Sequence, residues 1–517
     1  MKHFILIGLG AALVTALPTP GFSQALTSMA SVRVGYNTRK ASVNPQGELK
    51  AQIDEIDRQI ADAQRLGQNA QMRRLMAKGT TLLSGREWTD ALDFSTSLAL
   101  RTEHVIADST KPYPVRVEQL YAPSIELSRP LTVQARLRQR PAAPQGGAPA
   151  PGAVVKELGT FENVPRDLRE SPFALDLDVH DVADGTYQLA IDVLEAQRPL
   201  GTTTLLVNLR KGLDGIVTQI EADAKRAPEN VRADILFPVD RMNNVNKGRL
   251  ELRTFDPDKD FPAAQAVAAA STGGKNPFAT RTGDFKRHYL LDAASEILPY
   301  RMYVPTSYNG TRAYPLIIAL HGLGGTEDSF FDGYDRKFPG LAEQHGYIVA
   351  APLGYRVDGG YGWGIGNPPA DATTRRLQDL SEQDVMRVLE LVRKQYKIDD
   401  SRIYLTGHSL GAIGTWKMAP KYPDIWAAIA PFSGSGVPAT LERIKAIPEF
   451  VVHGDADPTV NVRGSRTMVE KMKEIGIDVT YIEVPGGNHG SVVAPNFDGL
   501  FKFFDAHRKP AKTTSQQ

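Results

Sequence analysis

The feature that most constrains the fold is a regular alternation of apolar runs and amphipathic segments between residues 281 and 508. The apolar runs are continuous, as expected of strands that are buried on both faces of a sheet. The segments between them have the length and the periodicity of surface helices. This order predicts an α/β fold over residues 281–510, with a mostly parallel sheet that is covered by helices on both faces.

The expected elements follow one another closely along this region. Strands are expected at RHYLLD, LPYRMYVP, YPLIIALHG, YIVAAPLG, RIYLTGHS, WAAIAPFSG, PEFVVHGDAD and VTYIEV, and helices over 327–345, 381–396, 410–421, 463–475 and 496–508. Right-handed crossovers bring the loops that follow parallel strands to one edge of the sheet. A functional site is therefore expected at that edge.

A turn at the end of one of these strands carries the pattern Gly-x-Ser-x-Gly, from Gly407 to Gly411. A strand that runs through such a turn into a helix holds its serine, here Ser409, up as a nucleophile. Side chains at Gly407 or Gly411 would collide with the neighbouring strand and helix. With 45 glycines in 517 residues, the pattern occurs by chance roughly 0.2 times per chain, so it is a hypothesis that needs partners.

A serine nucleophile needs a base within hydrogen-bond reach, and the base needs an orienting carboxylate. His489 follows the strand VTYIEV, and Asp457 follows the strand EFVV. The chain order Ser409, Asp457, His489 is one of the orders in which such triads occur. Asp455 is the alternative acid, and sequence geometry alone does not separate it from Asp457.

The other histidines near these turns are assigned supporting roles. His408 stands beside the serine and is expected to point away from the reacting centre. His321 and His453 begin turns after strands, where histidines commonly brace loops. His507 lies on the pattern of the last helix. None of these four is expected to be the base.

The oxyanion that forms during acyl transfer requires preorganised hydrogen-bond donors. The loop HGLGG follows the strand YPLIIAL, and we expect the backbone amides of Leu323 in that loop and of Leu410 after the serine to bind the oxyanion. The loop after YIVAAPLG carries Tyr355, Tyr361 and Trp363 among glycines. Their rings either stack on an aryl or sugar group of the substrate or close the loop onto the sheet edge.

Residues 281–508 resemble the α/β-hydrolase superfamily, and more closely the secreted esterases of the feruloyl esterase and polyhydroxybutyrate depolymerase type. The resemblance is carried by HGLGG, by YKIDDSRIYLTGHSLG, by HGDADPTV and by GGNHG. It implies a serine esterase without metal or organic cofactor, and it identifies the acid as Asp457, two residues before Thr-Val. One departure is Leu410-Gly-Ala412, where close relatives often carry a Gly-Gly pair.

Composition excludes several classes of site. The chain has no cysteine, so disulfides, thiolate metal sites and a cysteine nucleophile are ruled out. Lys and Arg (60) balance Asp and Glu (59), and the net charge of +1 gives no electrostatic footprint for nucleic acid. The partner that the resemblance implies is an ester substrate, either a small molecule or borne on a polymer, and no nucleic acid is expected.

The N-terminus has the pattern of a secretory signal over residues 1–25. Lys2 and His3 precede the apolar run FILIGLGAALVTAL, and a small-residue cleavage site ends at Ala25. The run is shorter than the ~20 residues needed to span a bilayer, which favours a cleaved signal over a membrane anchor. We therefore expect a secreted or periplasmic bacterial protein with no transmembrane segment after signal removal.

Three regions separate this signal from the α/β part. Residues 26–91 are expected to be an N-terminal segment with a helical hairpin over 48–83, where apolar residues recur at intervals of three and four. Residues 92–212 contain short alternating runs typical of antiparallel strands in an immunoglobulin-like β-sandwich. Tyr187 resembles the corner tyrosine of such domains, whose hydroxyl bonds to nearby backbone. Residues 213–280 are expected to be a mixed connector.

Finer features are expected within these regions. Residues 26–46 show no apolar periodicity, and residues 141–153, rich in Pro, Gly and Ala, are expected to be a flexible surface loop. The connector is expected to contain helices over 216–224 and 263–270, with a short strand at 250–254 between them.

The leading prediction is a secreted serine esterase. One alternative keeps the triad but cleaves peptides, as relatives of prolyl oligopeptidase do. It is disfavoured because residues 26–280 lack the four-strand repeats of the propeller that usually precedes such peptidases. A further alternative is a non-catalytic surface binding protein that uses the sandwich and the hairpin. The residues specify neither the natural acyl group nor the oligomeric state.

Overall fold

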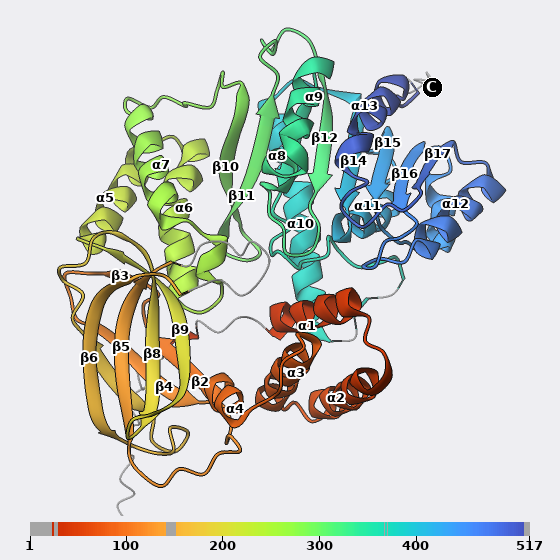
Figure 1. The fold of residues 1–517 in the computed structure, drawn as a ribbon. Helices are drawn as coiled ribbons and strands as arrows, with labels where there is room; N and C mark the ends of the chain where they lie inside the picture. Colours follow the sequence, from red (N-terminus) through yellow and green to blue (C-terminus); the bar gives the residue numbers. More distant parts are fainter. Residues whose placement is uncertain (1–22, 25–28, 141–150, 367, 370, 511–517) are drawn as a thin grey trace, which may run out of the picture. The chain divides into compact units, whose positions relative to one another are not determined.

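The chain forms two compact units, shown as a ribbon in Figure 1. The first contains Thr89–Leu213 and Met242–Phe255, and the second contains Thr27–Trp88, Asp214–Arg241 and Asp256–Gln517. This computed structural model describes residues 23–24, 29–140, 151–366, 368–369 and 371–510.

Two expected segments fall largely outside the described residues. Of the signal segment, only Ser23–Gln24 is described, as the short strand β1. Of the Pro/Gly/Ala segment, residues 141–150 lie outside. Among the residues that are described, no helix combines the length and the apolar composition needed to cross a membrane.

Three helices, and not the expected two, form a small bundle near the N-terminus. They are α1 (Met29–Val43), α2 (Gly47–Arg65) and α3 (Asn69–Leu83). The helix α1 joins the bundle mainly through Tyr36, whose buried ring packs onto Gly79 of α3 and whose hydroxyl donates to Asp57 (2.8 Å). Met29, Val32 and Val43 of α1 pack against the same core. Their common core consists of Tyr36, Ile53, Ile56, Ile60, Ala63, Met72, Leu75, Met76 and Leu83.

The first unit contains a four-stranded sheet, β1-β2-β4-β7, and a five-stranded sheet, β3-β9-β8-β5-β6, that share one hydrophobic core. A short helix, α4 (Asp90–Ser97), precedes them. The strands are β2 (Leu98–Thr102), β3 (Ile106–Asp108), β4 (Tyr113–Gln119), β5 (Leu131–Gln139), β6 (Val154–Val164), β7 (Phe173–Leu177), β8 (Gly185–Glu195) and β9 (Arg198–Arg210). The Tyr187 hydroxyl donates to the carbonyl of Ala183 (2.8 Å), which is the contact expected of a corner tyrosine.

Two details of this unit differ from the sequence expectation. β3 pairs with β9 in parallel, whereas all strands were expected to be antiparallel. The edge strand β6 was not expected, because most of its side chains are exposed and its sequence lacks an alternating pattern. The immunoglobulin-like assignment stays a prediction.

The connector is more helical than expected. It contains α5 (Leu213–Arg226), α6 (Glu229–Asn246) and α7 (Pro257–Ala270). The strand expected at 250–254 is wrong, because Leu252–Thr254 forms a 3-10 turn. The amides of Thr254 and Phe255 bond to carbonyls within this segment (both 3.0 Å) and not to a neighbouring strand.

An eight-stranded sheet forms the core of the second unit, in the order β10-β11-β13-β12-β14-β15-β16-β17. The pairs β10/β11 and β11/β13 are antiparallel, and all pairs from β13 to β17 are parallel. The strands are β10 (Gly283–Leu291), β11 (Glu296–Val304), β12 (Tyr314–Leu320), β13 (Ile348–Pro352), β14 (Ile398–His408), β15 (Ala428–Phe432), β16 (Glu449–Gly454) and β17 (Val479–Val484). Figure 1 shows β10 at one edge of the sheet and β17 at the other.

Helices cover this sheet, and every residue of β12 is buried, as expected of a strand covered on both faces. The helices are α8 (Ser329–Asp332), α9 (Lys337–His345), α10 (Ala372–Gln395), α11 (Leu410–Lys421), α12 (Arg463–Ile475) and α13 (Phe497–Ala506). Side chains of α8, α9 and α13 share one core with the strands. The α/β fold expected from the apolar runs is therefore present.

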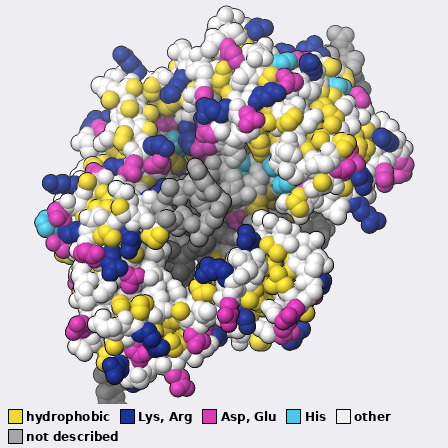
Figure 2. All heavy atoms as spheres, in the orientation of Figure 1, with side chains coloured by type: hydrophobic (Ala, Val, Ile, Leu, Met, Phe, Trp, Pro, Cys, Tyr) yellow, Lys and Arg dark blue, Asp and Glu magenta, His cyan; other side chains and the backbone are white. Residues whose placement is uncertain are grey.

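Basic and acidic side chains are interspersed on the face drawn in Figure 2.

Candidate active site

Ser409 lies in the sharp turn between β14 and α11. Its backbone has φ 58° and ψ −117°, a strained conformation for a residue with a side chain. A Cβ at Gly407 would lie 2.3 Å from the backbone of Gly411, and a Cβ at Gly411 would lie 2.0 Å from the carbonyl oxygen of Leu320. Both glycines are therefore required by close approach, as the sequence pattern predicts.

Asp457 and His489 lie in the loops after β16 and β17, and the two side chains meet. The distance from His489 Nδ1 to Asp457 Oδ2 is 2.7 Å. The Asp457 side chain has no exposed surface, whereas 19 % of the His489 side chain is exposed. Because the carboxylate can only accept, Nδ1 carries the proton and Nε2 is the acceptor. The sequence-predicted acid and base are thus brought together.

Hydrogen bonds keep Asp457 ionised. Burial by itself would raise the pKa of Asp457, but the hydrogen bonds from His489 and from the backbone amides of Val460 (3.0 Å) and Thr459 (2.8 Å) lower it below its ordinary value. At neutral pH the carboxylate therefore carries a negative charge that stabilises a protonated imidazole.

Asp455 has a different contact. Its side chain accepts a hydrogen bond from the backbone amide of Gly486 (2.6 Å) and so ties the turn after β16 to the loop after β17. Asp455 is exposed, and Asp457 is the one that reaches the His489 ring. The two aspartates that the sequence could not separate thus make different hydrogen bonds.

The loop after β12 lies against the serine. A Cβ at Gly322 would lie 3.3 Å from the Cβ of Ser409. Among the described residues, the amides of Leu323 and Leu410 donate no hydrogen bond, and Leu410 is the first residue of α11, where helix amides lack an internal partner. Two unpaired backbone donors are therefore available close to the serine.

The supporting histidines occupy different kinds of place. His453 Nε2 lies 3.2 Å from Asp457 Oδ2 and 3.0 Å from the carbonyl oxygen of Val460, so it braces the acid loop. His321 contacts the carbonyls of Gly322 and Leu353 (both 2.7 Å). These contacts agree with the bracing roles that the sequence predicts.

His408 is placed where the sequence did not predict it. Its ring centroid lies 4.8 Å from that of His489, so the expectation that it points away from the reacting centre is wrong. The adjacent serine turn gave no signal for this contact, because it depends on how the loop after β17 folds back onto β14.

Comparison with known proteins gives a family for part of the chain. Residues 295–463 match the family model described as "Putative esterase". Over these residues the chain is therefore similar to the esterase family, and we call residues 281–510 the esterase region. Ser409 and Asp457 fall within the matched residues, and His489 follows them.

The esterase region is also similar to curated proteins. One is the bifunctional acetylxylan esterase/xylanase XynS20E of Neocallimastix patriciarum, 29 % identical over 28 % of this chain and 20 % of that protein. Another is feruloyl esterase B of Talaromyces stipitatus, 33 % identical over 26 % of this chain and 36 % of that protein. The chain thus spans well under half the length of each. A solved structure of a thermostable esterase aligns with a TM-score of 0.36 at 17 % identity, over 78 % of this chain and 98 % of that one.

The aromatic loop of the esterase region is anchored to its neighbours. The ring of Tyr361 is 1 % exposed, and its hydroxyl donates to the carbonyl of His321 (3.0 Å). The Trp363 indole donates to Asp379 (2.7 Å), and the Tyr355 hydroxyl to Glu296 (3.3 Å). Burial leaves the Tyr361 ring no face for a substrate, so this ring closes the loop onto the sheet.

This loop also supports the loop after β12. The carbonyl of Val357 accepts a hydrogen bond from the amide of Gly324 (2.8 Å), next to Leu323. Asp384 of α10 accepts hydrogen bonds from the amide of Tyr355 (2.7 Å) and from the hydroxyl of Tyr289 (2.6 Å). The backbone that presents Leu323 is therefore fixed by a second loop.

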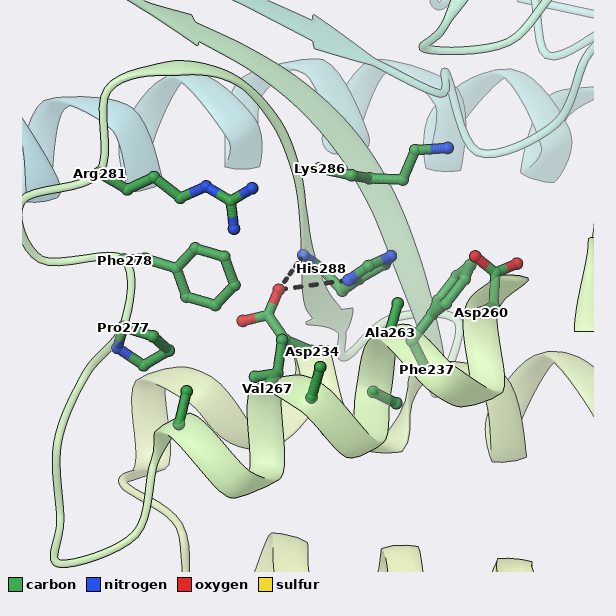
Figure 3. Close-up of a pocket in the computed structure, with 13 residues that line it drawn as sticks. Asp234, Phe237, Asp260, Ala263, Val267, Pro277, Phe278, Arg281, Lys286 and His288 are labelled. Carbon is green, nitrogen blue, oxygen red and sulfur yellow. Dashed lines mark hydrogen bonds and ion pairs between the residues drawn. The ribbon is translucent and has the colours of Figure 1, made fainter. Parts of the chain in front are cut away.

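A second Asp–His pair lies at the opposite edge of the sheet, beside a cavity of about 350 Å³. Figure 3 shows Asp234 of α6 pointing at His288 of β10. The carboxylate accepts from the His288 amide (2.8 Å) and lies 3.2 Å from its Nδ1. The residues that line the cavity are Asp234, Phe237, Asp260, Ala263, Ala264, Ala266, Val267, Ala270, Pro277, Phe278, Arg281, Lys286 and His288, with no hydroxyl or thiol side chain among them.

Proposed function

We propose that the esterase region hydrolyses carboxylic esters through a Ser409-His489-Asp457 triad. The observation that carries the proposal is the 2.7 Å contact between His489 Nδ1 and Asp457 Oδ2, in loops at the same sheet edge as the strained turn of Ser409. The match of residues 295–463 to an esterase family supports the same reaction class.

The reaction divides into two acyl-transfer steps. The Ser409 hydroxyl attacks the ester carbonyl while His489 Nε2 takes its proton, and the imidazolium then protonates the departing alcohol. This leaves an acyl-enzyme on Ser409. A water molecule, deprotonated by His489, attacks the acyl carbon and releases the acid, and the proton returns to Ser409.

Asp457 and two amides stabilise charge during these steps. Asp457 holds the imidazole in the tautomer with the proton on Nδ1 and stabilises the imidazolium. The amides of Leu323 and Leu410 donate to the oxyanion, and donors of this kind contribute about 2.7–4 kcal/mol each. The position of Leu410 at the N-terminus of α11 adds the positive end of the helix dipole.

For the acyl group of the substrate, we propose a chemical class and not one particular acid. The relatives are named for feruloyl and acetylxylan esters, so we propose esters with a feruloyl-like aromatic acyl group or an acetyl group, free or borne on a polymer, as the substrate class. Export, inferred from the apolar N-terminal run, would bring the enzyme to such polymers outside the cell.

The test is a serine substitution with a matched serine control. Ser409→Ala is expected to lower kcat for short-chain p-nitrophenyl esters by roughly 10⁴- to 10⁶-fold, because the nucleophile is lost. Ser401→Ala, in the same strand but hydrogen-bonded to Asp399, is expected to leave kcat unchanged. Circular dichroism checks that both variants fold. Activity that survives in Ser409→Ala would overturn the proposal.

A substrate panel then tests the reaction class. Acetyl, feruloyl and hydroxybutyrate esters are compared with a peptide anilide at equal concentration. Ester cleavage is expected to dominate, and faster cleavage of the anilide would favour a peptidase.

A further inference from the structure

The backbone carbonyl of the proposed base is held by two side chains from outside its own loop. The oxygen of His489 lies 2.9 Å from His408 Nε2 and 3.0 Å from Ser433 Oγ. His408 is the last residue of β14, and Ser433 directly follows β15. Side chains at the ends of two neighbouring strands therefore bind the loop that carries His489.

The hydrogen-bond chemistry fixes the tautomer of His408. The His489 carbonyl can only accept, so His408 Nε2 carries the proton. Burial lowers the pKa of His408 to about 4, so the ring is neutral at neutral pH and Nδ1 has a lone pair. The Tyr334 hydroxyl lies 2.8 Å from Nδ1 and therefore donates to it. The chain of donors runs from Tyr334 through His408 to the carbonyl of His489.

Both residues that supply a hydroxyl to this network have a backbone with positive φ. Ser433 has φ 53°, and the consecutive residues Tyr334, Asp335 and Arg336 have φ 52°, 58° and 55°. Such conformations cost of order 1–3 kcal/mol each in residues with side chains and persist only where the surroundings impose them. They occur at Tyr334 and Ser433, the two hydroxyl donors of the network, so the surrounding structure holds both donors in unfavourable backbone conformations.

The loop that carries His489 needs such an anchor. Gly486 and Gly487 precede it, and glycine leaves the backbone many accessible conformations. Gly486 has φ 67°, and its amide is tied to Asp455. Among the hydrogen bonds of the described residues, the His489 ring is bonded at Nδ1 to Asp457, and the carbonyl of the same residue is bonded to side chains from outside the loop.

We propose that His408, oriented by Tyr334 and assisted by Ser433, is a positioning residue that clamps the His489 carbonyl and so places the imidazole between Asp457 and Ser409. The effect of the clamp on catalysis rests on the proposed function. Its effect on the conformation of the loop does not depend on that function. His408 acts through His489 and makes no contact with the substrate.

Two substitutions at His408 separate the donor from the bulk of the ring. His408→Leu removes the donor, and the loop can then displace the imidazole, for which a loss of about 10²-fold in kcat is expected. KM is expected to change less than about twofold, because ground-state contacts with substrate remain. His408→Gln keeps an amide donor near the place of Nε2 and is expected to recover most of the lost kcat.

Substitutions at the other two members of the network, Tyr334 and Ser433, are expected to give smaller losses of kcat. Tyr334→Phe removes the hydroxyl that orients the His408 ring at Nδ1, and Ser433→Ala removes one of the two donors to the His489 carbonyl, so each is expected to lower kcat by roughly 3- to 10-fold. His288→Gln is the matched control. It also replaces a largely buried imidazole, but at the far edge of the sheet, and is expected to leave kcat unchanged.

Hydrogen–deuterium exchange of residues 485–493 gives a readout that does not need activity. Exchange of this segment is expected to rise at least about tenfold in His408→Leu and to stay near the wild-type rate in His408→Gln and His288→Gln. Unchanged exchange and unchanged kcat in His408→Leu would overturn the clamp. Equal impairment of His408→Leu and His408→Gln would also overturn it, because ring packing would then be the cause.

The outcome for Ser409→Ala keeps the two proposals apart. If that variant retains activity, the esterase mechanism fails, and the exchange data still decide whether the clamp exists. If it is inactive while His408→Leu matches the wild type in both measurements, only the clamp fails.

Discussion

The two edges of the same sheet each carry an Asp–His pair, and only one of the two belongs to the proposed triad. Beyond β16 and β17, Asp457 contacts His489 at 2.7 Å; at β10, Asp234 contacts His288 at 3.2 Å. Both carboxylates are buried, with side chains 0 % and 2 % exposed. Burial of the acid and a hydrogen bond to the imidazole therefore do not distinguish the proposed catalytic pair from the second pair.

The counter-charge distinguishes the two pairs. Asp234 is paired with the buried guanidinium of Arg287 (3.2 Å), whereas Asp457 is held by backbone amides and by His453. Burial lowers the pKa of His453, so this ring adds no positive charge at neutral pH. The charge of Asp457 is thus available to an imidazolium, while that of Asp234 is already neutralised.

The surroundings of each imidazole on the side away from its aspartate differ as well. The His288 ring stacks on Phe237 (3.9 Å between centroids), and its Nε2 is buried without a hydrogen-bond partner among the described residues. His489 follows β17 at the carboxyl ends of the parallel strands, where Ser409 follows β14. These differences favour the Asp457–His489 pair, and not the Asp234–His288 pair, as the proposed base.

The largest expected effect tests the acid of the first pair. Asp457→Asn is expected to lower kcat by on the order of 10⁴-fold, because the amide no longer stabilises the imidazolium or its tautomer. Asp455→Asn is expected to lower kcat less than about tenfold, since Asp455 only ties Gly486. Steady-state kinetics on a p-nitrophenyl ester measure both. A larger loss at Asp455 would exchange the two roles.

The same substitution at the second pair is expected to act on stability. Asp234→Asn leaves the buried Arg287 without its counter-charge, and breaking a buried ion pair costs about 3–5 kcal/mol. Urea unfolding measures the change in free energy of unfolding. Activity per folded molecule is expected to match the wild type. Loss of activity without loss of stability would show that the comparison between the two pairs is wrong.

The smallest expected effect concerns stability: the contributions of Asp457 and Asp260 to stability are expected to change with pH in opposite directions. The pKa of Asp457 is lowered, so its contribution to stability is present above the ordinary value of 3.8 and is lost as the pH falls through the lowered pKa. Burial raises the pKa of Asp260, beside the second pair, more than Lys286 and His288 lower it. Its contribution to stability is therefore lost as the pH rises from 3.8 through the raised pKa.

Urea midpoints between about pH 3 and pH 7 test this contrast. Relative to wild type, Asp457→Asn is expected to be more destabilised at neutral pH than at the acidic end. Asp260→Asn is expected to change in the opposite sense and to gain stability toward neutral pH. Shifts of the same sign in both variants would contradict the assignment of the two environments.

Sequence reasoning succeeded where burial follows a local period. The continuous apolar runs located the eight strands of the second unit, and the alternation in LTVQARLRQ located β5. It failed where the pattern is weak: α1 buries Tyr36 in a mostly polar sequence, β6 is an exposed edge strand, and α6 contains Pro238 and buried polar residues such as Asp234.

The sequence by itself determined which residues could do the chemistry. Ser409, Asp457 and His489 follow their strands in a fixed order, and the glycines around the serine are dictated by its local turn. These features depend on short segments of chain, whose conformation a local pattern specifies.

Only the tertiary structure decided which of the neighbouring groups meet. Asp455 and Asp457 lie in the same turn but contact different groups, and His408 reaches a carbonyl 81 positions away. Asp234 finds His288 across 54 positions. Contacts of this kind are set by how strands and helices pack in space, because hydrogen bonds between distant segments leave no period in the sequence.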